Sequence, residues 1–97
     1  MHAVVRSYAG SGAKELFDRI VAARDEVEGL IRGVPGFVNY TLIRTPDGGL
    51  TITVCDNKTG CDESIRVARE WVSANASDLS LPPLNVSDGP VDLHFAS

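Results

Sequence analysis

The segment LIRTPDGGLTITVCD, residues 42–56, constrains the fold most, because it is typical of a β-hairpin. Its dipeptide Asp47-Gly48 favours a tight turn between two antiparallel strands. The residues before the turn, Phe37–Thr45, are rich in β-branched and aromatic side chains, and Leu50–Asp56 alternates apolar and polar residues. We therefore predict that Phe37–Thr45 and Leu50–Asp56 are paired strands joined by the residues PDGG.

The segments on either side of the hairpin predict two helices and two further strands. We expect strands at His2–Tyr8 and Val91–Phe95, helices at Ser11–Ile31 and Asn57–Ala76 (the second capped by Thr59 or Gly60), and a loop at Ser77–Pro90. This βαββαβ order is the ferredoxin-like pattern of an α+β protein. A four-stranded antiparallel sheet then carries both helices on one face. We predict that residues 1–97 form a single domain of this kind.

A glycine-x-glycine turn in YAGSGAKEL, residues 8–16, lies between the first strand and the first helix. A dinucleotide-binding loop needs a third glycine and a Walker loop needs Gly-Lys-Ser/Thr, and the sequence has neither. The turn also lacks the arginine of acylphosphatases, and Asn39 falls one residue early for the pattern of that family. We therefore expect a helix start, with Ser11 or Gly12 as cap and Glu15 reaching back in a capping box.

Charge and hydropathy limit the partners of the chain. The formal net charge is −4 and the nine Lys and Arg residues are dispersed, which argues against nucleic acid as a partner. No apolar run approaches the roughly 20 residues that span a bilayer, and no signal peptide is visible, so we expect no membrane contact and a cytoplasmic location. The histidines, cysteines and acids lack metal-ligand spacing, and we expect no metal and no cofactor. Cys55 and Cys61 match neither a CxxC pair nor a zinc set, so free thiols are expected.

Strand alternation sorts the side chains onto two faces of the sheet. Because Leu50, Ile52 and Val54 are apolar, we expect them to pack under the helices. The other face would then be mixed, which suits a homodimer interface that encloses a partly polar cavity. We assign to this mixed face Val4, Arg6, Tyr8, Phe37, Asn39, Thr41, Ile43, Thr51, Thr53, Cys55, Asp92 and His94.

The candidates for ligand binding are Arg6, Tyr8, Asn39, Trp71 and His94. Arg6 beside Tyr8 can clamp an anionic or carbonyl group, or Arg6 can pair with Asp92 across an interface, since a buried charge needs a partner. His94 can be a base oriented by Asp92 or a hydrogen-bonded interface residue. Cys61 lies on the apolar stripe of its helix and is expected to be an inert core thiol. No catalytic residue can be assigned.

Two stretches, VPGFVNYTLIRT (34–45) and TVCDNKTGCDESIRVAREWV (53–72), carry a resemblance that extends over the chain. They are similar to the dimeric α/β-barrel group that includes antibiotic-biosynthesis-monooxygenase-like proteins, and within it to small bacterial proteins without a settled activity. The resemblance implies a homodimer whose two sheets face each other, with the helices outside. Haem-degrading members use an asparagine on the first strand, where this chain has Arg6 and Ser7, and a histidine that residues 65–85 lack. These differences argue against haem cleavage, and Trp71 is the position in this region that corresponds to the family site.

Two functions remain open at this point. The resemblance, together with Arg6, Asn39, Tyr40 and Trp71, implies a cofactor-independent oxygenase or isomerase acting on a small aromatic or quinone-like molecule. The lack of a recognisable catalytic constellation favours instead a non-catalytic homodimer that binds a small ligand or is structural. An apolar cavity on the order of several hundred Å³ with converging polar groups would distinguish a ligand site from a filled interior.

We predict that Trp71 belongs to the core. It lies beside the apolar stripe of Cys61, Ile65, Ala68 and Val72, so its indole is expected over the sheet next to the first helix. Trp71→Ala should then lower the free energy of unfolding by about 3–5 kcal/mol, because the lost transfer free energy and a cavity term add. Denaturant melts measure this change. A loss below about 1 kcal/mol would show that the indole only borders empty or wet space.

Overall fold

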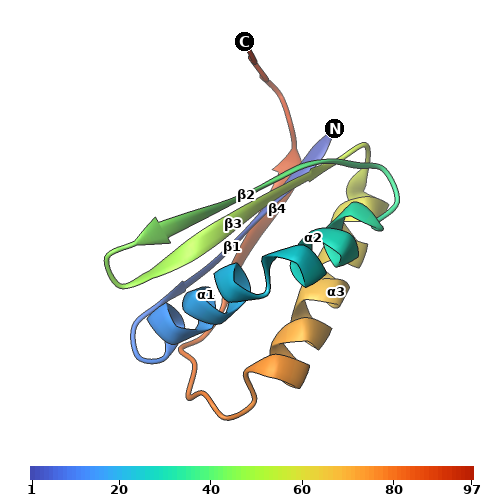
Figure 1. The fold of residues 1–97 in the computed structure, drawn as a ribbon. Helices are drawn as coiled ribbons and strands as arrows, with labels where there is room; N and C mark the ends of the chain where they lie inside the picture. Colours follow the sequence, from blue (N-terminus) through green and yellow to red (C-terminus); the bar gives the residue numbers. More distant parts are fainter.

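A four-stranded antiparallel sheet with all helices on one face forms the framework of the computed structural model, which describes residues 1–97 (Figure 1). The strands lie in the order β2-β3-β1-β4. This order is that of the ferredoxin-like fold, so the predicted fold class is confirmed. None of the helices has the length and apolar character needed to cross a membrane. The elements are β1 (His2–Ala9), α1 (Ala13–Ala22), α2 (Arg24–Arg32), β2 (Phe37–Thr45), β3 (Gly48–Cys55), α3 (Lys58–Asn75) and β4 (Asn85–Pro90).

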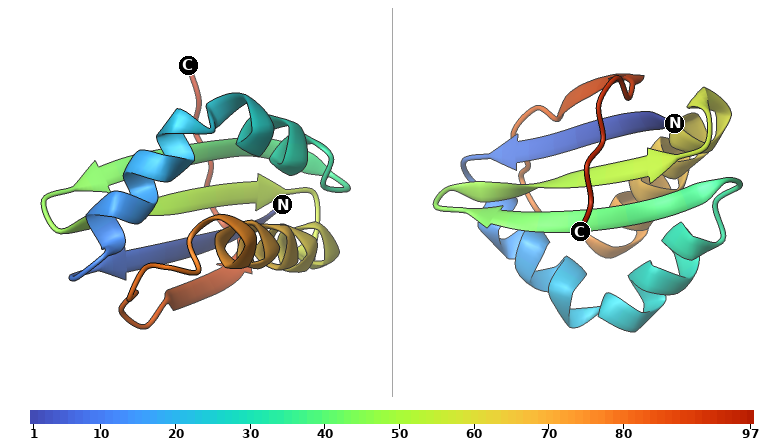
Figure 2. Two further views of the ribbon diagram at one scale, coloured as in Figure 1. Left: turned by 60° about the horizontal axis from the view of Figure 1, so that its bottom comes forward. Right: turned by 90° about the horizontal axis from the view of Figure 1, so that it is seen from above.

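The connection between β1 and β2 contains two helices, whereas the sequence predicts one over Ser11–Ile31. The backbone of Ala23 (φ −96°, ψ 27°) leaves the helical region and separates α1 from α2. Figure 2 shows that the two helices meet at an angle, so that the connection bends over the sheet. The apolar positions keep their spacing of three or four residues across the break. The sequence pattern therefore cannot reveal it.

α1 begins at a glycine that the surrounding chain requires. Gly12 has φ 83°, and a Cβ at this position would lie 2.5 Å from the carbonyl oxygen of Ser80. The prediction of Gly12 as the cap is confirmed, although the glycine has no side chain with which to bond the helix. The predicted capping box is wrong, because the carboxylate of Glu15 accepts a hydrogen bond from Arg19 one turn later.

Two other boundaries differ from the predictions by a few residues. The hairpin turn consists of Pro46 and Asp47 alone, because the two glycines that follow already belong to β3. α3 is capped by Asn57, whose side-chain oxygen accepts a hydrogen bond from the backbone N–H of Gly60 at 3.2 Å, and not by Thr59 or Gly60. Asparagine is among the residues that cap helices best.

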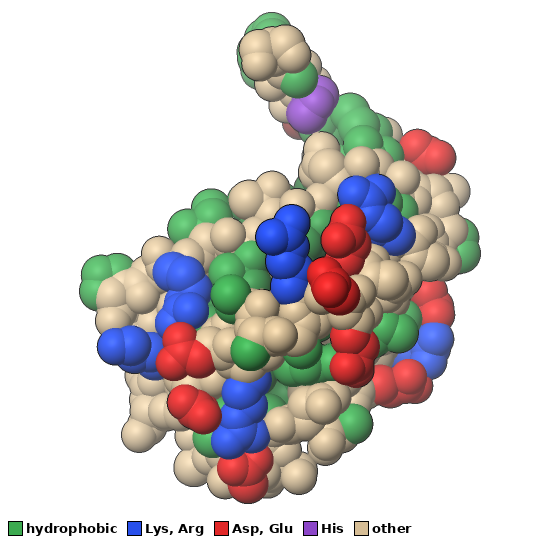
Figure 3. Space-filling view, viewed as in Figure 1, with side chains coloured by type: hydrophobic (Ala, Val, Ile, Leu, Met, Phe, Trp, Pro, Cys, Tyr) green, Lys and Arg blue, Asp and Glu red, His purple; other side chains and the backbone are tan.

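The last strand lies in the segment predicted to be a loop. β4 (Asn85–Pro90) pairs with β1 along its whole length, and Val91–Phe95, the predicted strand, lies outside the sheet. The register explains this difference, because Pro90 already pairs with His2 at the start of β1 and the following residues have no partner strand. The composition NVSDGP is poor in strand formers, but an edge strand pairs through its backbone on one side only. The C-terminal segment projects away from the body of the molecule (Figures 1 and 3).

The helices cover the face of the sheet opposite to the predicted one. Alternation grouped the side chains of β1 and β3 correctly, since Arg6 pairs with Thr51 and Val4 pairs with Thr53. Hydropathy nevertheless predicted the wrong group as the buried one, because an arginine and two threonines line the face under the helices. The helix-covered face carries Val4, Arg6, Tyr8, Thr51, Thr53 and Cys55, and the open face carries Ala3, Val5, Ser7, Leu50, Ile52 and Val54.

A bulge in β2 changes the face on which its residues lie. The register shifts between Phe37 and Asn39. Tyr40 therefore pairs with Thr53 and faces the helices. The prediction that placed Asn39 and Thr41 on the same face as Arg6 and the threonines of β3 assumed an unbroken alternation, and it is wrong for this reason.

The interior contains two apolar clusters, and the first of them includes both cysteines. Cys55 and Cys61 are free and fully buried. The Cys61 thiol donates a hydrogen bond to the carbonyl oxygen of His2 at 3.2 Å. Burial raises the pKa of Cys55 to about 11 and also raises that of Cys61, so neither thiolate forms readily. The clusters are Val4, Val34, Cys55 and Cys61, and Leu16, Trp71 and Ala76.

We expect both thiols to be unreactive in the native protein at neutral pH, because the thiolate is the attacking species and both sulfurs are buried. A disulfide reagent should titrate no thiol rapidly in the folded protein and two per chain after unfolding. Protein reduced beforehand serves as the control. A deficit in the unfolded, unreduced sample would reveal a disulfide and contradict the expectation of free thiols.

Candidate functional site

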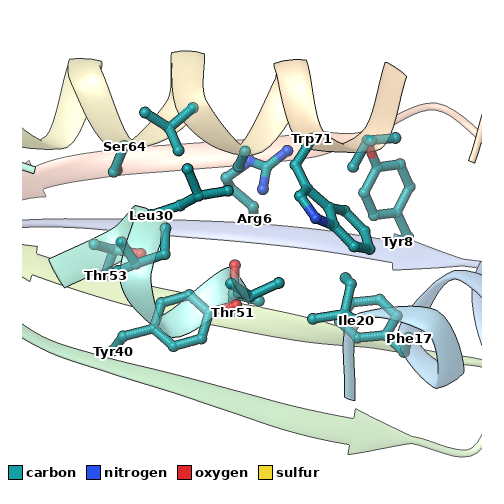
Figure 4. A pocket seen from close by; sticks show the side chains of 15 residues that line it. Arg6, Tyr8, Phe17, Ile20, Leu30, Tyr40, Thr51, Thr53, Ser64 and Trp71 are labelled. Carbon is teal, nitrogen blue, oxygen red and sulfur yellow. The ribbon is translucent and has the colours of Figure 1, made fainter. Parts of the chain in front are cut away.

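A cavity between the helix-covered face of the sheet and the three helices gathers most of the polar side chains of the interior (Figure 4). β1 supplies Arg6 and Tyr8, β2 supplies Tyr40, and β3 supplies Thr51 and Thr53. The polar groups therefore come mostly from the sheet. The helices form an apolar wall opposite them, apart from Ser64, and this wall includes Phe17, Ile20, Leu30, Val67, Trp71 and Val72.

The cavity is narrow, but it adjoins a wider groove. Its volume is about 40 Å³, which is enough for a few water molecules or the polar end of a ligand. The groove runs between α1, α2 and the edge strand β2 and has a volume of about 430 Å³, within the range of small-molecule sites. Both hollows are lined by Ile20, Val27, Ile31 and Tyr40, so they are neighbours on either side of these side chains.

Arg6 is the buried charge of this cavity and has no partner in the chain. Its residue surface is 8% exposed, and its Nε and Nη2 atoms are buried without a hydrogen bond. Burial lowers the pKa of Arg6, and nearby Tyr8 and Tyr40 oppose this effect. A guanidinium still remains protonated in a protein. The cavity therefore holds a positive charge that no carboxylate of the chain neutralises.

Arginines nearer the surface are treated differently. Arg19 donates to both oxygens of Asp78 at 2.7 and 2.8 Å, and Arg44 donates to Asp18 at 2.8 Å. Figure 3 shows basic and acidic side chains next to one another on the face in view. Such exposed pairs contribute little to stability. The arginine that most needs a counter-charge is thus the one that lacks it.

The tyrosine and hydroxyl side chains supply hydrogen-bonding groups to the cavity. Burial raises the pKa of Tyr40 although the charge of Arg6 lowers it, so the phenol is protonated at neutral pH and can donate. The hydroxyl of Ser64 already donates to the carbonyl oxygen of Cys61 at 2.7 Å. Thr51 and Thr53 are buried in the floor of the cavity. Of these groups, Tyr40 borders both the cavity and the groove.

Trp71 is at once a core residue and a wall of the cavity. It is 8% exposed and clusters with Leu16 of α1, as expected for an indole beside the first helix. Its indole N–H donates to the carboxylate of Glu26 at 3.0 Å, which connects α3 to α2. Figure 4 shows the ring on the helix side of the cavity, near Arg6. Trp71 therefore shapes the cavity from a fixed position.

The structure brings together three of the five predicted site residues: Arg6, Tyr8 and Trp71 line one cavity. Asn39 lies outside this cavity and borders the groove at β2. His94 lies in the exposed C-terminal segment, so the predicted pairing of His94 with a site is not formed within this chain. The predicted pair of Arg6 with Asp92 is wrong, because Arg6 faces the helices whereas Asp92 is exposed beyond β4.

Sequence reasoning missed the polar floor of the cavity. Thr51 and Thr53 were expected on the interface face, and Ser64 was not considered. The sequence signal for the floor is the alternation of β3, and for Ser64 it is the spacing of three or four residues that also includes Ala68 and Trp71. No group of three or more His, Cys, Asp or Glu side chains gathers in a way that could hold a metal ion.

Several solved structures share this fold. A protein of unknown function from Nitrosomonas europaea has a TM-score of 0.72 at 16% identity, over 99% of this chain and 92% of that chain. SnoaB, a cofactor-independent oxygenase from Streptomyces nogalater, has a TM-score of 0.68 at 16% identity, over 99% and 97%. MhuD, which binds two manganese protoporphyrin IX molecules per active site, has a TM-score of 0.71 at 12% identity and full coverage of both chains.

A further structure of this fold, from an uncultured marine organism, is of a dimeric ferredoxin-like protein, with a TM-score of 0.64 at 10% identity over 99% and 97% of the two chains. No family model matches the sequence, and no curated protein matches it either. Identities of this size establish the fold alone. The fold that the sequence resemblance implied is thereby confirmed, and the structures of this fold include an oxygenase, a porphyrin-binding protein and a protein of unknown function.

Proposed function

We propose that this chain is a homodimeric protein that binds a small aromatic or quinone-like molecule between its sheet and helices, as a cofactor-independent oxygenase or isomerase. The observation that carries the proposal is the unpaired guanidinium of Arg6, buried at an otherwise largely apolar cavity. Apolar walls with a few placed polar groups are the usual composition of a small-molecule site. The neighbouring groove of about 430 Å³ provides room for a ring system that the inner cavity of about 40 Å³ cannot hold alone.

The chemistry fits the groups that the cavity presents. A reaction that proceeds without a cofactor must draw its electrons from the substrate, and an enolate or phenolate is the form of an aromatic hydroxy compound that gives them up. A fixed cation and hydrogen-bond donors stabilise the charge on such an oxygen, more strongly where water is excluded. Arg6 supplies the cation and the protonated Tyr40 supplies a donor. SnoaB, a cofactor-independent oxygenase, has the same fold, which supports the proposal without deciding it.

A non-catalytic binding protein is the second candidate. The observation in its favour is that no carboxylate and no imidazole lines the cavity, whose ionisable residues are Arg6, Tyr8 and Tyr40. General bases are most often histidine or an acidic residue. A chain that binds its ligand without changing it needs no such group.

The homodimer part of the proposal rests on the open face of the sheet. This face carries Val5, Ile43, Leu50 and Ile52, and Ile43 is 43% exposed. An antiparallel sheet that faces water normally carries polar residues on that side. A second copy of the chain, sheet against sheet, would cover these side chains, and a domain of this length benefits from such burial.

The binding proposal predicts stabilisation by small aromatic or quinone-like molecules. At a concentration of about 100 times its Kd, a true ligand should raise the melting temperature on the order of 10 °C, by mass action. Ala68→Leu, which fills the cavity from α3, should abolish the shift, whereas Ala74→Leu on the exposed side of α3 should retain it. Oxygen uptake or product formation with the stabilising compounds then separates the enzyme from the binder. Equal shifts in both variants would contradict the proposed location.

The dimer proposal predicts twice the mass of one chain in light scattering at micromolar concentration. Ile52→Lys places a charge in the middle of the open face and should yield a folded monomer, because a buried unpaired charge is costly. Val21→Lys, at an exposed position of α1, is the matched control and should remain dimeric. Circular dichroism verifies that both variants fold. A monomeric wild-type protein would refute the proposal.

A further inference from the structure

We propose that the ligand of this cavity carries a planar oxyanion, a carboxylate or a phenolate or enolate oxygen, which binds to the free edge of the Arg6 guanidinium. The inference rests on the proposed binding function and adds the charge and shape of the ligand to it. The ligand's anionic end occupies the inner cavity, and its apolar rings extend past Tyr40 into the groove beside β2.

The two unpartnered atoms of Arg6 define the direction of binding. Nε and Nη2 carry N–H groups that point from the same edge of the planar guanidinium, and both atoms are buried without a hydrogen bond. This edge forms two parallel hydrogen bonds with a carboxylate, the geometry in which arginine binds planar anions best. An isolated anionic oxygen can accept from both groups at once. The pattern of unsatisfied atoms is therefore the complement of an oxyanion.

The charge balance also calls for an anion. The ionisable groups that influence Arg6 are Tyr8, Tyr40 and Arg69, and none of them is a carboxylate. Burial of a charge without a partner is costly, so an incoming anion gains an interaction that the empty protein lacks. Because no carboxylate or imidazole lines the cavity to take up a proton, the negative charge must come with the ligand.

The dimensions separate the ligand into two parts. The inner cavity of about 40 Å³ accommodates a carboxylate or a single ring oxygen but no ring system. The groove of about 430 Å³ is lined mainly by apolar side chains and shares Ile20, Val27, Ile31 and Tyr40 with the cavity. A molecule with one acidic end and a flat apolar body matches both spaces. Uniformly polar metabolites do not match the groove.

Three naphthalene probes test this inference by thermal shift and titration: 2-naphthoate, its neutral amide 2-naphthamide, and 2-naphthol. We expect 2-naphthoate to bind at least about tenfold more tightly than 2-naphthamide, as charge-assisted hydrogen bonds imply. If the site selects phenolates, 2-naphthol should instead show the absorption band of its anion when bound at neutral pH. Either result supports the inference, and the two results distinguish a carboxylate from a phenolate ligand.

The variants Arg6→Met and Arg69→Met provide the matched comparison. Arg6→Met keeps a long apolar side chain and removes the unpaired charge, so the free protein should melt at the same or a higher temperature. The preference for 2-naphthoate, or the anion band of 2-naphthol, should disappear in this variant. Arg69→Met removes an exposed arginine that does not line the cavity, and it should behave like the wild type.

The possible failures are distinguishable. If 2-naphthoate and 2-naphthamide bind equally and bound 2-naphthol stays neutral, the anion inference is wrong and water satisfies Arg6, while the proposed small-molecule site stands. An anion preference that survives in Arg6→Met places the anion elsewhere and also overturns the inference. If none of the probes binds, both the inference and the proposed function fail.

Discussion

The antiparallel pairing of β1 with β3 at the centre of the sheet is the constraint on which the remaining structure depends. Its register sets Arg6 opposite Thr51 and so selects the side chains that lie under the helices. The same pairing brings the glycines at the start of β3 against the end of β1. A Cβ on Gly49 would lie 2.9 Å from the ring of Phe17, so this glycine lets α1 approach the sheet closely. The floor and one wall of the cavity thus follow from a single register.

That register buries a guanidinium, which has a cost for stability. The neighbouring core is apolar and closely packed, and only the cavity beside Arg6 leaves its Nε and Nη2 without protein partners. Cores tend to satisfy their polar groups, and exceptions in a native fold concentrate at functional sites. This is the physical reason for assigning function to the cavity and not to the exposed ion pairs or the C-terminal segment.

Much of the fold was predictable because its signals are local. The hairpin around Asp47-Gly48, the alternation of β3 and the apolar spacing of α3 each depend on neighbouring residues, and their order implies the ferredoxin-like topology. The break at Ala23 was not predictable, because no proline or glycine marks it and the apolar spacing continues across it. β4 was missed for a related reason, since NVSDGP becomes a strand only by pairing with an existing partner.

The candidate site shows where local information ends. The sequence by itself determined that Arg6 and Tyr8 share a face and that Trp71 lies on the inner side of its helix, because side-chain periodicity is a property of the backbone. Only the tertiary structure decided which face the helices cover, and it buried the arginine and the threonines beneath them, against their hydropathy. It also removed Asn39 from that face through a bulge and left His94 outside the sheet. A strand's alternation is two-fold symmetric, so the choice between its faces depends on packing against other elements and cannot be made by the strand alone.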